Sequence, residues 1–334
     1  TWGTPVDVSS PAEGAGDANA PDVAISADGT KATVVWAHTD PDTSVNRIEA
    51  KSATISGTTP TFGVLKTLSD ASPVDAPRND TNPVLALNDA GTRAVVLWSA
   101  NQDPTETVTG GAWIHVKTGT ISGNGSTWGA KVESVGFGSL TPEVAVSSDG
   151  TKATWVWNNI TSDGETQNPP VVLARSATIS GNTLSAGTVK TVSDPDLGAD
   201  SPTLGMSSDG TKATVIWMGR NMGAWLLQSR SMTISGNTQT WGDLTDLSNN
   251  LEDAVSPALA LSSDGTKAIA TWSNGGAAAQ SISMRLGIIT GTAAAWADTT
   301  GVTGYLQSAG NLGLAASDDA SKATAIWTSQ LGDM

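Results

Sequence analysis

The segment Ser207-Ser-Asp-Gly-Thr-Lys-Ala-Thr-Val-Ile-Trp217 decides the fold, because variants of it occur six times along the chain. The copies end at tryptophans that lie 55 to 62 residues apart, namely Trp36, Trp98, Trp157, Trp217, Trp272 and Trp327. Self-similarity at a period of this size indicates an array of like structural units. We therefore predict one repeated unit throughout the 334 residues rather than several unrelated domains.

Each copy predicts two β-strands that are joined by a tight turn. An apolar run that begins at a proline, such as residues 202–206, predicts the first strand, because proline is tolerated at a strand's first residue. The following Asp209-Gly210 supplies the positive φ that a tight hairpin requires. The second strand, residues 213–217, is apolar on both faces, which is typical of a strand buried on both sides.

The sequence after each repeated tryptophan predicts two more strands. Residues 231–236 end in Ile-Ser-Gly, and an aromatic residue follows five positions later in most repeats, as Trp241 does. A glycine comes next in four of five repeats, and Ala297 is the exception. Four antiparallel strands per period, without helical periodicity, are typical of a β-propeller blade. The sequence thus predicts an all-β propeller of six four-stranded blades, each of about 55–60 residues.

The two ends of the chain predict how this propeller closes. The sixth unit contains only its first two strands, whereas residues 1–8 resemble a fourth strand. We expect this N-terminal strand to pair with the C-terminal blade, because closure removes exposed sheet edges. Residues 1–334 would then be one domain, with units near 21–80, 81–140, 141–200, 201–255, 256–310 and 311–334 plus 1–20. An open segment of a longer repeat protein is the alternative.

The long, variable loops lie at one end of the predicted blades and carry many of the acidic residues. They follow the repeated tryptophans or connect successive blades, and such loops usually carry function on a rigid scaffold. The net charge of −15 argues against nucleic acid and anionic membranes as partners. We predict that this acidic face binds a protein or a carbohydrate. The alternative is that the acids only keep the protein soluble.

Residues that occur once, rather than in every blade, are the candidates for ligand contact. Trp113 and Trp225 border variable loops and are candidates for stacking on a sugar, which makes a propeller lectin one alternative. The arginines predicted for the same face are Arg47, Arg78 and Arg220. The repeated tryptophans are instead expected to pack between blades.

Two known bacterial repeats resemble this one. The Ser-x-Asp-Gly-Thr-Lys turn is similar to the turn of TolB-like propellers, and Ser-x-Asp-Gly-Thr followed by Trp resembles the Asp-box of sialidases. The sialidase resemblance implies a tyrosine nucleophile, for which Tyr305 is the candidate, and an arginine triad, for which Arg47, Arg78 and Arg220 are the candidates. The Asp-box normally lies between the third and fourth strands, unlike the turn here. We predict that the protein is not an enzyme, and a sialidase-like glycosidase is the alternative.

Calcium is the best candidate for a bound ion. Asp194, Asp196 and Asp200 stand at the first, third and seventh positions of a loop that contains a glycine, and calcium prefers oxygen ligands. The alternative is a loop whose acids are simply solvated.

The composition predicts an exported bacterial protein. The chain contains no cysteine, which excludes disulfides and thiol chemistry, and no apolar run is long enough for membrane insertion. We expect an extracellular or cell-surface location, with the chain either monomeric or part of a larger surface protein.

Overall fold

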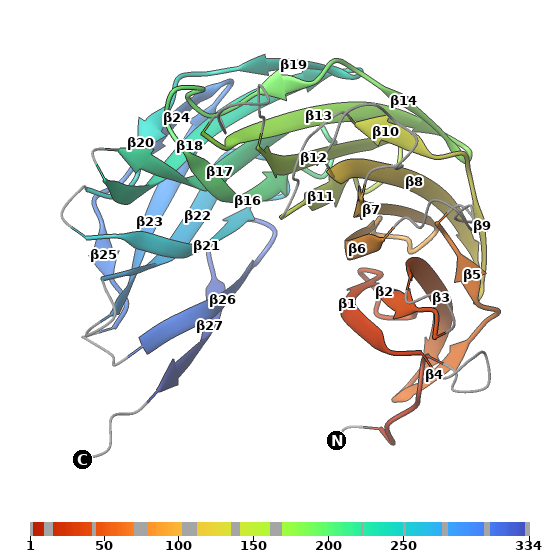
Figure 1. The fold of residues 1–334 in the computed structure, drawn as a ribbon. Coiled ribbons are helices and arrows are strands. Elements are labelled where there is room, and N and C mark those ends of the chain that lie inside the picture. Colours follow the sequence, from red (N-terminus) through yellow and green to blue (C-terminus); the bar gives the residue numbers. More distant parts are fainter. Residues whose placement is uncertain are drawn as a thin grey trace. The chain divides into compact units, whose positions relative to one another are not determined.

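The computed structural model describes residues 3–9, 16–41, 45–69, 79–101, 112–134, 141–160, 169–221, 223–249, 252–275, 280–303 and 308–330. The elements among these residues are β-strands, which form five larger antiparallel sheets and one two-stranded sheet (Figure 1). The all-β prediction is confirmed. The chain divides into two compact units: unit 1 holds Thr1–Ala153, Asn159–Ser162 and Ala177–Ala186, and unit 2 holds Thr154–Asn158, Asp163–Ser176 and Gly187–Met334.

The strands follow the repeat. The first sheet contains β1 (Ala18–Ile25), β2 (Lys31–Thr39), β3 (Asn46–Ser56), β4 (Thr59–Phe62) and β5 (Lys66–Thr67). The second contains β6 (Asp80–Leu87), β7 (Arg93–Asn101), β8 (Ala112–Ser122), β9 (Gly125–Trp128) and β10 (Val132–Ser134). The third contains β11 (Glu143–Val146), β12 (Lys152–Asn159), β13 (Val171–Ser180), β14 (Thr183–Ala186) and β15 (Lys190–Thr191).

The remaining sheets belong to unit 2. The fourth contains β16 (Ala199–Met206), β17 (Lys212–Asn221), β18 (Ala224–Ser235), β19 (Thr238–Trp241) and β20 (Thr245–Asp246). The fifth contains β21 (Ala254–Leu261), β22 (Lys267–Asn274), β23 (Ser281–Thr290), β24 (Ala293–Trp296) and β25 (Thr300–Gly301). The two-stranded sheet contains β26 (Ser308–Ala316) and β27 (Ala323–Gln330).

The predicted fourth strand is divided into two short strands. In the fourth sheet, β19 and β20 both pair with β18, and Gly242 follows the end of β19. A Cβ atom added at Gly242 would overlap the carbonyl oxygen of Thr292 in the turn of the next sheet. The glycine that follows the aromatic residue therefore allows the backbones of neighbouring sheets to come close together.

The first strand of most sheets contains a bulge that sequence analysis did not predict. The register of β16 shifts between Asp200 and Thr203, and Ser201, just before Pro202, has a φ of 49°. Similar positive φ values occur at Ala20, Asn82, Ser256 and Asn311. The prediction that proline begins the strand is wrong for the first, second, fourth and fifth sheets, because the strand begins earlier and the proline lies in the bulge. A bulge leaves a residue outside the ladder, and this tolerates the missing N–H of proline.

The repeated turn has the predicted local structure and also joins neighbouring sheets. In the first sheet, the hydroxyl of Ser26 and the amide of Thr30 donate to the same oxygen of Asp28, at 2.6 and 2.9 Å. These hydrogen bonds lower the pKa of Asp28 to about 2. Lys31 Nζ donates to the carbonyl of Ala90 in the next turn at 2.8 Å. The repeated lysine is therefore part of the scaffold.

The core lies between successive sheets. Trp98, Trp217 and Trp272 are at most 1% exposed, and each packs against the preceding sheet of the same unit. Trp217, for example, shares a cluster with Val156 and Val172 of the third sheet. The prediction that the repeated tryptophans pack between blades is confirmed for these three.

The N-terminal segment lies against the first sheet. Lys51 Nζ donates to the carbonyl of Val8 at 2.8 Å, and a Cβ atom added at Gly3 would overlap the carbonyl oxygen of Thr58. The outer part of the first sheet meets the second in the same way, with Lys117 bonded to the carbonyl of Leu68 at 2.6 Å. Residues 3–8 thus lie where the outer strand of a preceding sheet would lie.

Ring closure is not seen among the described residues. Residues 3–9 form no strand, β27 pairs only with β26 there, and Trp2 lies outside the described ranges. Within those ranges, no helix is long and apolar enough to cross a membrane.

Candidate functional site

Two of the predicted ligand-binding residues lie opposite each other at the loop end of the fourth sheet. The β17–β18 ladder continues to its last pairs, so that Arg220 faces Trp225 across the hairpin. The guanidinium carbon of Arg220 lies 5.8 Å from the centroid of the Trp225 indole ring. Arg220 is exposed and Trp225 is half-buried. The pair therefore presents a cation and an aromatic surface together, a cation–π arrangement that remains open to solvent.

Two connecting loops hold this hairpin end in place. The amide of Trp225 donates to Oδ1 of Asp253, just before β21, at 2.9 Å. The amide of Arg220 donates to the carbonyl of Gly198, just before β16, at 2.6 Å. We define the Arg220–Trp225 site as these four residues. Its backbone is supported from both neighbouring connections, so the two side chains are positioned by the scaffold.

The predicted calcium loop runs beside this site, but two of its carboxylates accept hydrogen bonds from nearby amide groups. Asp194 accepts a hydrogen bond from the amide of Asp196 at 3.0 Å. Asp200 accepts from the side-chain amide of Asn158 at 2.9 Å and from the amide of Ser201 at 2.6 Å. Across the described ranges, no group of three acidic or histidine residues is arranged to hold a metal ion. The calcium site stays a prediction that this loop geometry does not support.

Trp113 lies at the loop end of the second sheet, in unit 1, opposite Ala100. In the second sheet, Trp113 lies two residue pairs along the ladder from the pair that contains Trp98. In the fourth sheet, Trp225 lies three pairs from the pair that contains Trp217. Successive strand residues point to opposite faces, so the two indoles lie on opposite faces of their hairpins. Trp113 is therefore not equivalent to Trp225.

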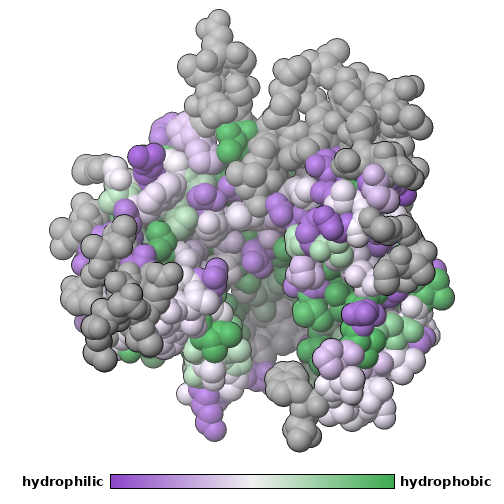
Figure 2. Space-filling model, turned by 60° about the horizontal axis from the view of Figure 1, so that its bottom comes forward, coloured by the Kyte–Doolittle hydropathy of each residue, from purple (hydrophilic) through white to green (hydrophobic). Residues whose placement is uncertain are grey.

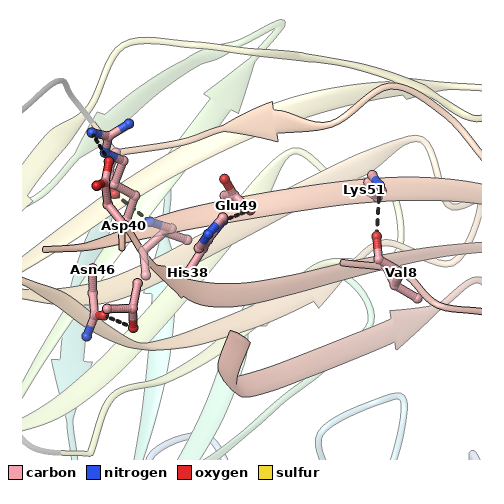
Figure 3. A network of polar contacts seen from close by, with 10 residues as sticks. Val8, His38, Asp40, Asn46, Glu49 and Lys51 are labelled. Carbon is pink, nitrogen blue, oxygen red and sulfur yellow. Dashed lines mark hydrogen bonds and ion pairs between the residues drawn. The ribbon is translucent and has the colours of Figure 1, made fainter. Parts of the chain in front are cut away.

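Arg47 belongs to a polar network on the first sheet, of which Figure 3 labels Asp40, His38 and Glu49. Its guanidinium forms an ion pair with Asp40 at 2.9 Å. On the same two strands, Nδ1 of His38 lies 3.0 Å from a carboxylate oxygen of Glu49, and both side chains are mostly buried. The charge of Arg47 is therefore balanced within the sheet. Arg78 and Tyr305 lie outside the described residues.

A pair of carboxylates on the first strands of unit 1 was not anticipated. Asp22 in β1 accepts a hydrogen bond from the amide of Leu85 in β6 at 2.7 Å, and burial raises its pKa. Glu143 in β11 keeps exposed surface, yet desolvation of its carboxyl group and the nearby charge of Asp22 raise its pKa to about 7. Both residues follow the repeat's proline, where the second, fourth and fifth sheets have Val84, Thr203 and Ala258. An acidic residue where the other repeats have an uncharged one was the feature of the sequence from which Asp22 and Glu143 could have been identified.

Comparison with known proteins shows the fold and no more. No protein-family model and no curated protein matches the chain. A solved structure of an α-L-arabinofuranosidase from Fusarium graminearum, with an iminosugar inhibitor, is similar at a TM-score of 0.50 and 11% identity, covering 94% of this chain and 89% of that one. A protein from Lactobacillus plantarum has a TM-score of 0.48 and 16% identity over 91% and 79% of the two chains. A Trypanosoma rangeli sialidase has a TM-score of 0.41 and 12% identity over 80% and 47%.

The repeated antiparallel sheets, in each of which the predicted fourth strand is divided in two, and this structural similarity define the class of the protein as a β-propeller repeat protein. The part of the chain that the structure describes contains five larger sheets and one two-stranded sheet. Because one fold of this kind carries many functions, function has to be argued from the site.

Proposed function

We propose that the protein is a binding module, exported to the cell surface or beyond, that recognises a glycan at the Arg220–Trp225 site. One observation carries the proposal: the exposed guanidinium of Arg220 lies beside the indole of Trp225 at the loop end of a buried hairpin. An indole face packs against the C–H face of a sugar ring, and a guanidinium and a carboxylate bind its hydroxyl groups. Asp253 supplies that carboxylate beside the indole.

The charge of the protein narrows the class of glycan. With a net charge of −15, the molecule repels polyanions over a long range, whereas a neutral sugar approaches without such a penalty. The local positive charge of Arg220 favours a sugar that accepts hydrogen bonds at the rim of the site. Neutral or singly acidic oligosaccharides are therefore the proposed ligands, and catalysis is not part of the proposal.

Replacing Trp225 by alanine is expected to weaken glycan binding by about 10- to 100-fold, because stacking on an aromatic face contributes roughly 1–3 kcal/mol. Arg220→Ala is expected to weaken it by about 10-fold through loss of a charge-assisted hydrogen bond. A glycan array would identify the ligand, and calorimetric titration would measure its dissociation constant for each variant. Trp113→Ala is the matched control, with unchanged binding expected.

Equal binding by wild type and Trp225→Ala would contradict the proposed site. A different result would favour a glycosidase: hydrolysis of a chromogenic glycoside by the wild type that is lost in Glu143→Gln. A carboxyl group with a pKa near 7 beside a second carboxylate is suited to general acid catalysis, which makes Glu143 the residue to change in that assay.

We also propose that the chain forms a six-bladed ring in which residues 3–8 serve as the outer strand of the last blade. Support comes from the contacts of these residues with the first sheet, which repeat those between complete sheets. The chain contains no cysteine, so single labels can be placed at the exposed residues Val6 and Ser321 after substitution by cysteine. A closed ring predicts one narrow distribution of label distances, below about 30 Å. A broad distribution at longer distances would contradict closure.

A further inference from the structure

The side of the fifth sheet that faces β26 and β27 is incompletely covered. Val302, just after β25, is 40% exposed, whereas its equivalents in the first, third and fourth sheets are at most 1% exposed. These equivalents are Leu68, Val192 and Leu247. In those sheets the following sheet covers the residue. Among the described residues, the strands of the fifth sheet that contact β26 most are its first two, β21 and β22.

The sequence of the uncovered surface is more apolar than in any other repeat. Leu286 and Ile288 of β23 are 51% and 65% exposed. The residues equivalent to Leu286 are Ser52, Thr118, Ser176 and Ser231, all buried, and those equivalent to Ile288 are Thr54, Thr120, Thr178 and Thr233. Exposed leucine and isoleucine where the other repeats have hydroxyl residues mark an interaction surface.

The edge of β27 borders this surface. Within the described ranges β27 pairs only with β26, whereas the equivalent strands β2, β7, β12, β17 and β22 pair on both sides (Figure 1). Ile326 is 68% exposed on the opposite face of β27, where its equivalents, such as Val35 and Ile216, pack against the following sheet. A view with the bottom of Figure 1 brought forward shows hydrophobic side chains at the surface among hydrophilic ones (Figure 2). An open strand edge beside apolar side chains suits the addition of another strand.

The other sheets indicate which strand fits there. In each of the five larger sheets, the third strand pairs with the strand that is equivalent to β27. This third strand carries a lysine or arginine four residues before an isoleucine, as Lys51 precedes Ile55 in β3. In two sheets this cation donates to the carbonyl just after the preceding outer strand, Lys117 to Leu68 and Arg230 to Val192, and in the first sheet Lys51 donates to Val8 of the N-terminal segment. A strand with the same pattern on β27 would place its cation at the carbonyl of Val302.

Ala297 limits what the partner can bring. In the first four sheets the equivalent glycine lies against the carbonyl of the following turn, where a Cβ atom would overlap the oxygen. These glycines are Gly63, Gly129, Gly187 and Gly242. The methyl group of Ala297 excludes a turn placed in that way. A single strand meets no such obstacle, and the larger side chains of Leu286 and Ile288 fill space beneath it.

We propose that the β27 edge, with Leu286, Ile288 and Val302, is a docking surface for one β-strand of a protein partner. That strand carries a lysine or arginine and an apolar residue four positions later. The interface continues the contact that the fifth sheet already makes with β26. It lies entirely within unit 2 and is separate from the Arg220–Trp225 site, so the two can be tested independently.

A fluorescein-labelled peptide of residues 45–57 is the probe, because it is the third strand of the first sheet and carries Lys51 and Ile55 in this pattern. Fluorescence anisotropy with the full chain is expected to show saturable one-to-one binding. The variant with Leu286→Ser and Ile288→Thr is expected to bind at least 10-fold more weakly. Both changes restore residues found in other repeats, at exposed positions, so an unchanged melting temperature is expected.

Three results would overturn the proposal. One is binding no stronger than that of a scrambled peptide, and another is equal binding to wild type and the double variant. The third is a wild-type dimer in analytical ultracentrifugation that the double variant dissociates, because a second copy would then cover the surface. A peptide with Lys51→Ala is expected to bind several-fold more weakly, because it lacks the cation that would reach the carbonyl of Val302.

Discussion

Replacing Trp217 by alanine is expected to lower the free energy of unfolding by about 3–5 kcal/mol, the usual cost of truncating a fully buried tryptophan. The indole is 0% exposed and packs in the cluster between the third and fourth sheets. Its Nε1 also donates to Oε1 of Gln228 at 3.1 Å, so the change would leave a buried amide oxygen without this donor. Equilibrium unfolding in urea, followed by tryptophan fluorescence and circular dichroism, would measure the loss.

Trp225→Ala is the matched control for this prediction, because Trp225 is half-buried at the loop end of the same sheet. Its expected cost is about 1 kcal/mol, since less apolar surface leaves the interior. If both variants lost the same amount, the repeated tryptophan would not be the main contact between these sheets. The control also shows that Trp225→Ala is folded when its glycan binding is measured.

Gly129→Ala is expected to destabilise the protein by about 3 kcal/mol, an effect that secondary-structure propensity would not predict. A Cβ atom at this position would overlap the carbonyl oxygen of Asn182 in the next sheet and lie 2.8 Å from its carbonyl carbon. These are backbone atoms, so no side-chain rotation relieves the overlap. The turn that contains Asn182 would have to move, and it is held by hydrogen bonds of Asn182 with Thr120 and Thr127, at 2.6 and 3.1 Å.

Gly301→Ala provides the comparison for Gly129→Ala. The nearest atom to a Cβ added at Gly301 is 3.9 Å away, an ordinary van der Waals distance. The change is expected to alter the free energy of unfolding by no more than about 0.5 kcal/mol. Thermal and urea unfolding of both variants would decide the matter. A similar, small effect of both substitutions would mean that the sheets separate easily at their outer ends.

The repeat predicted most of the fold because local and tertiary requirements coincide in it. Asp28-Gly29 needs only its own backbone to form the turn, and the alternation around Trp36 reports burial on both faces of a strand. The structure departs from prediction where a neighbouring sheet intervenes. The division of the fourth strand after Trp241 comes with the close approach of Gly242 to Thr292 of the next sheet, a contact that a single repeat does not contain.

Prediction of the candidate site was partial for a similar reason. Arg220 and Trp225 stood out because they do not recur, and the ladder register then brought them together. Asp253 is distant in sequence and enters the site only through its bond to the amide of Trp225. The spacing of Asp194, Asp196 and Asp200 is suitable for binding an ion. Spacing does not reveal, however, that the carboxylate of Asp200 accepts a hydrogen bond from the side-chain amide of Asn158.

The sequence by itself determined the all-β class, the repeated unit and the positions of the tryptophans Trp98, Trp217 and Trp272 in the core, since these follow from periodicity and short-range turn chemistry. Only the tertiary structure decided which sheet faces remain uncovered, which loops support Arg220 and where residues 3–8 lie. These features depend on contacts between residues far apart in the chain. Such contacts form across the 55- to 62-residue repeat, a separation at which no local pattern specifies the partner.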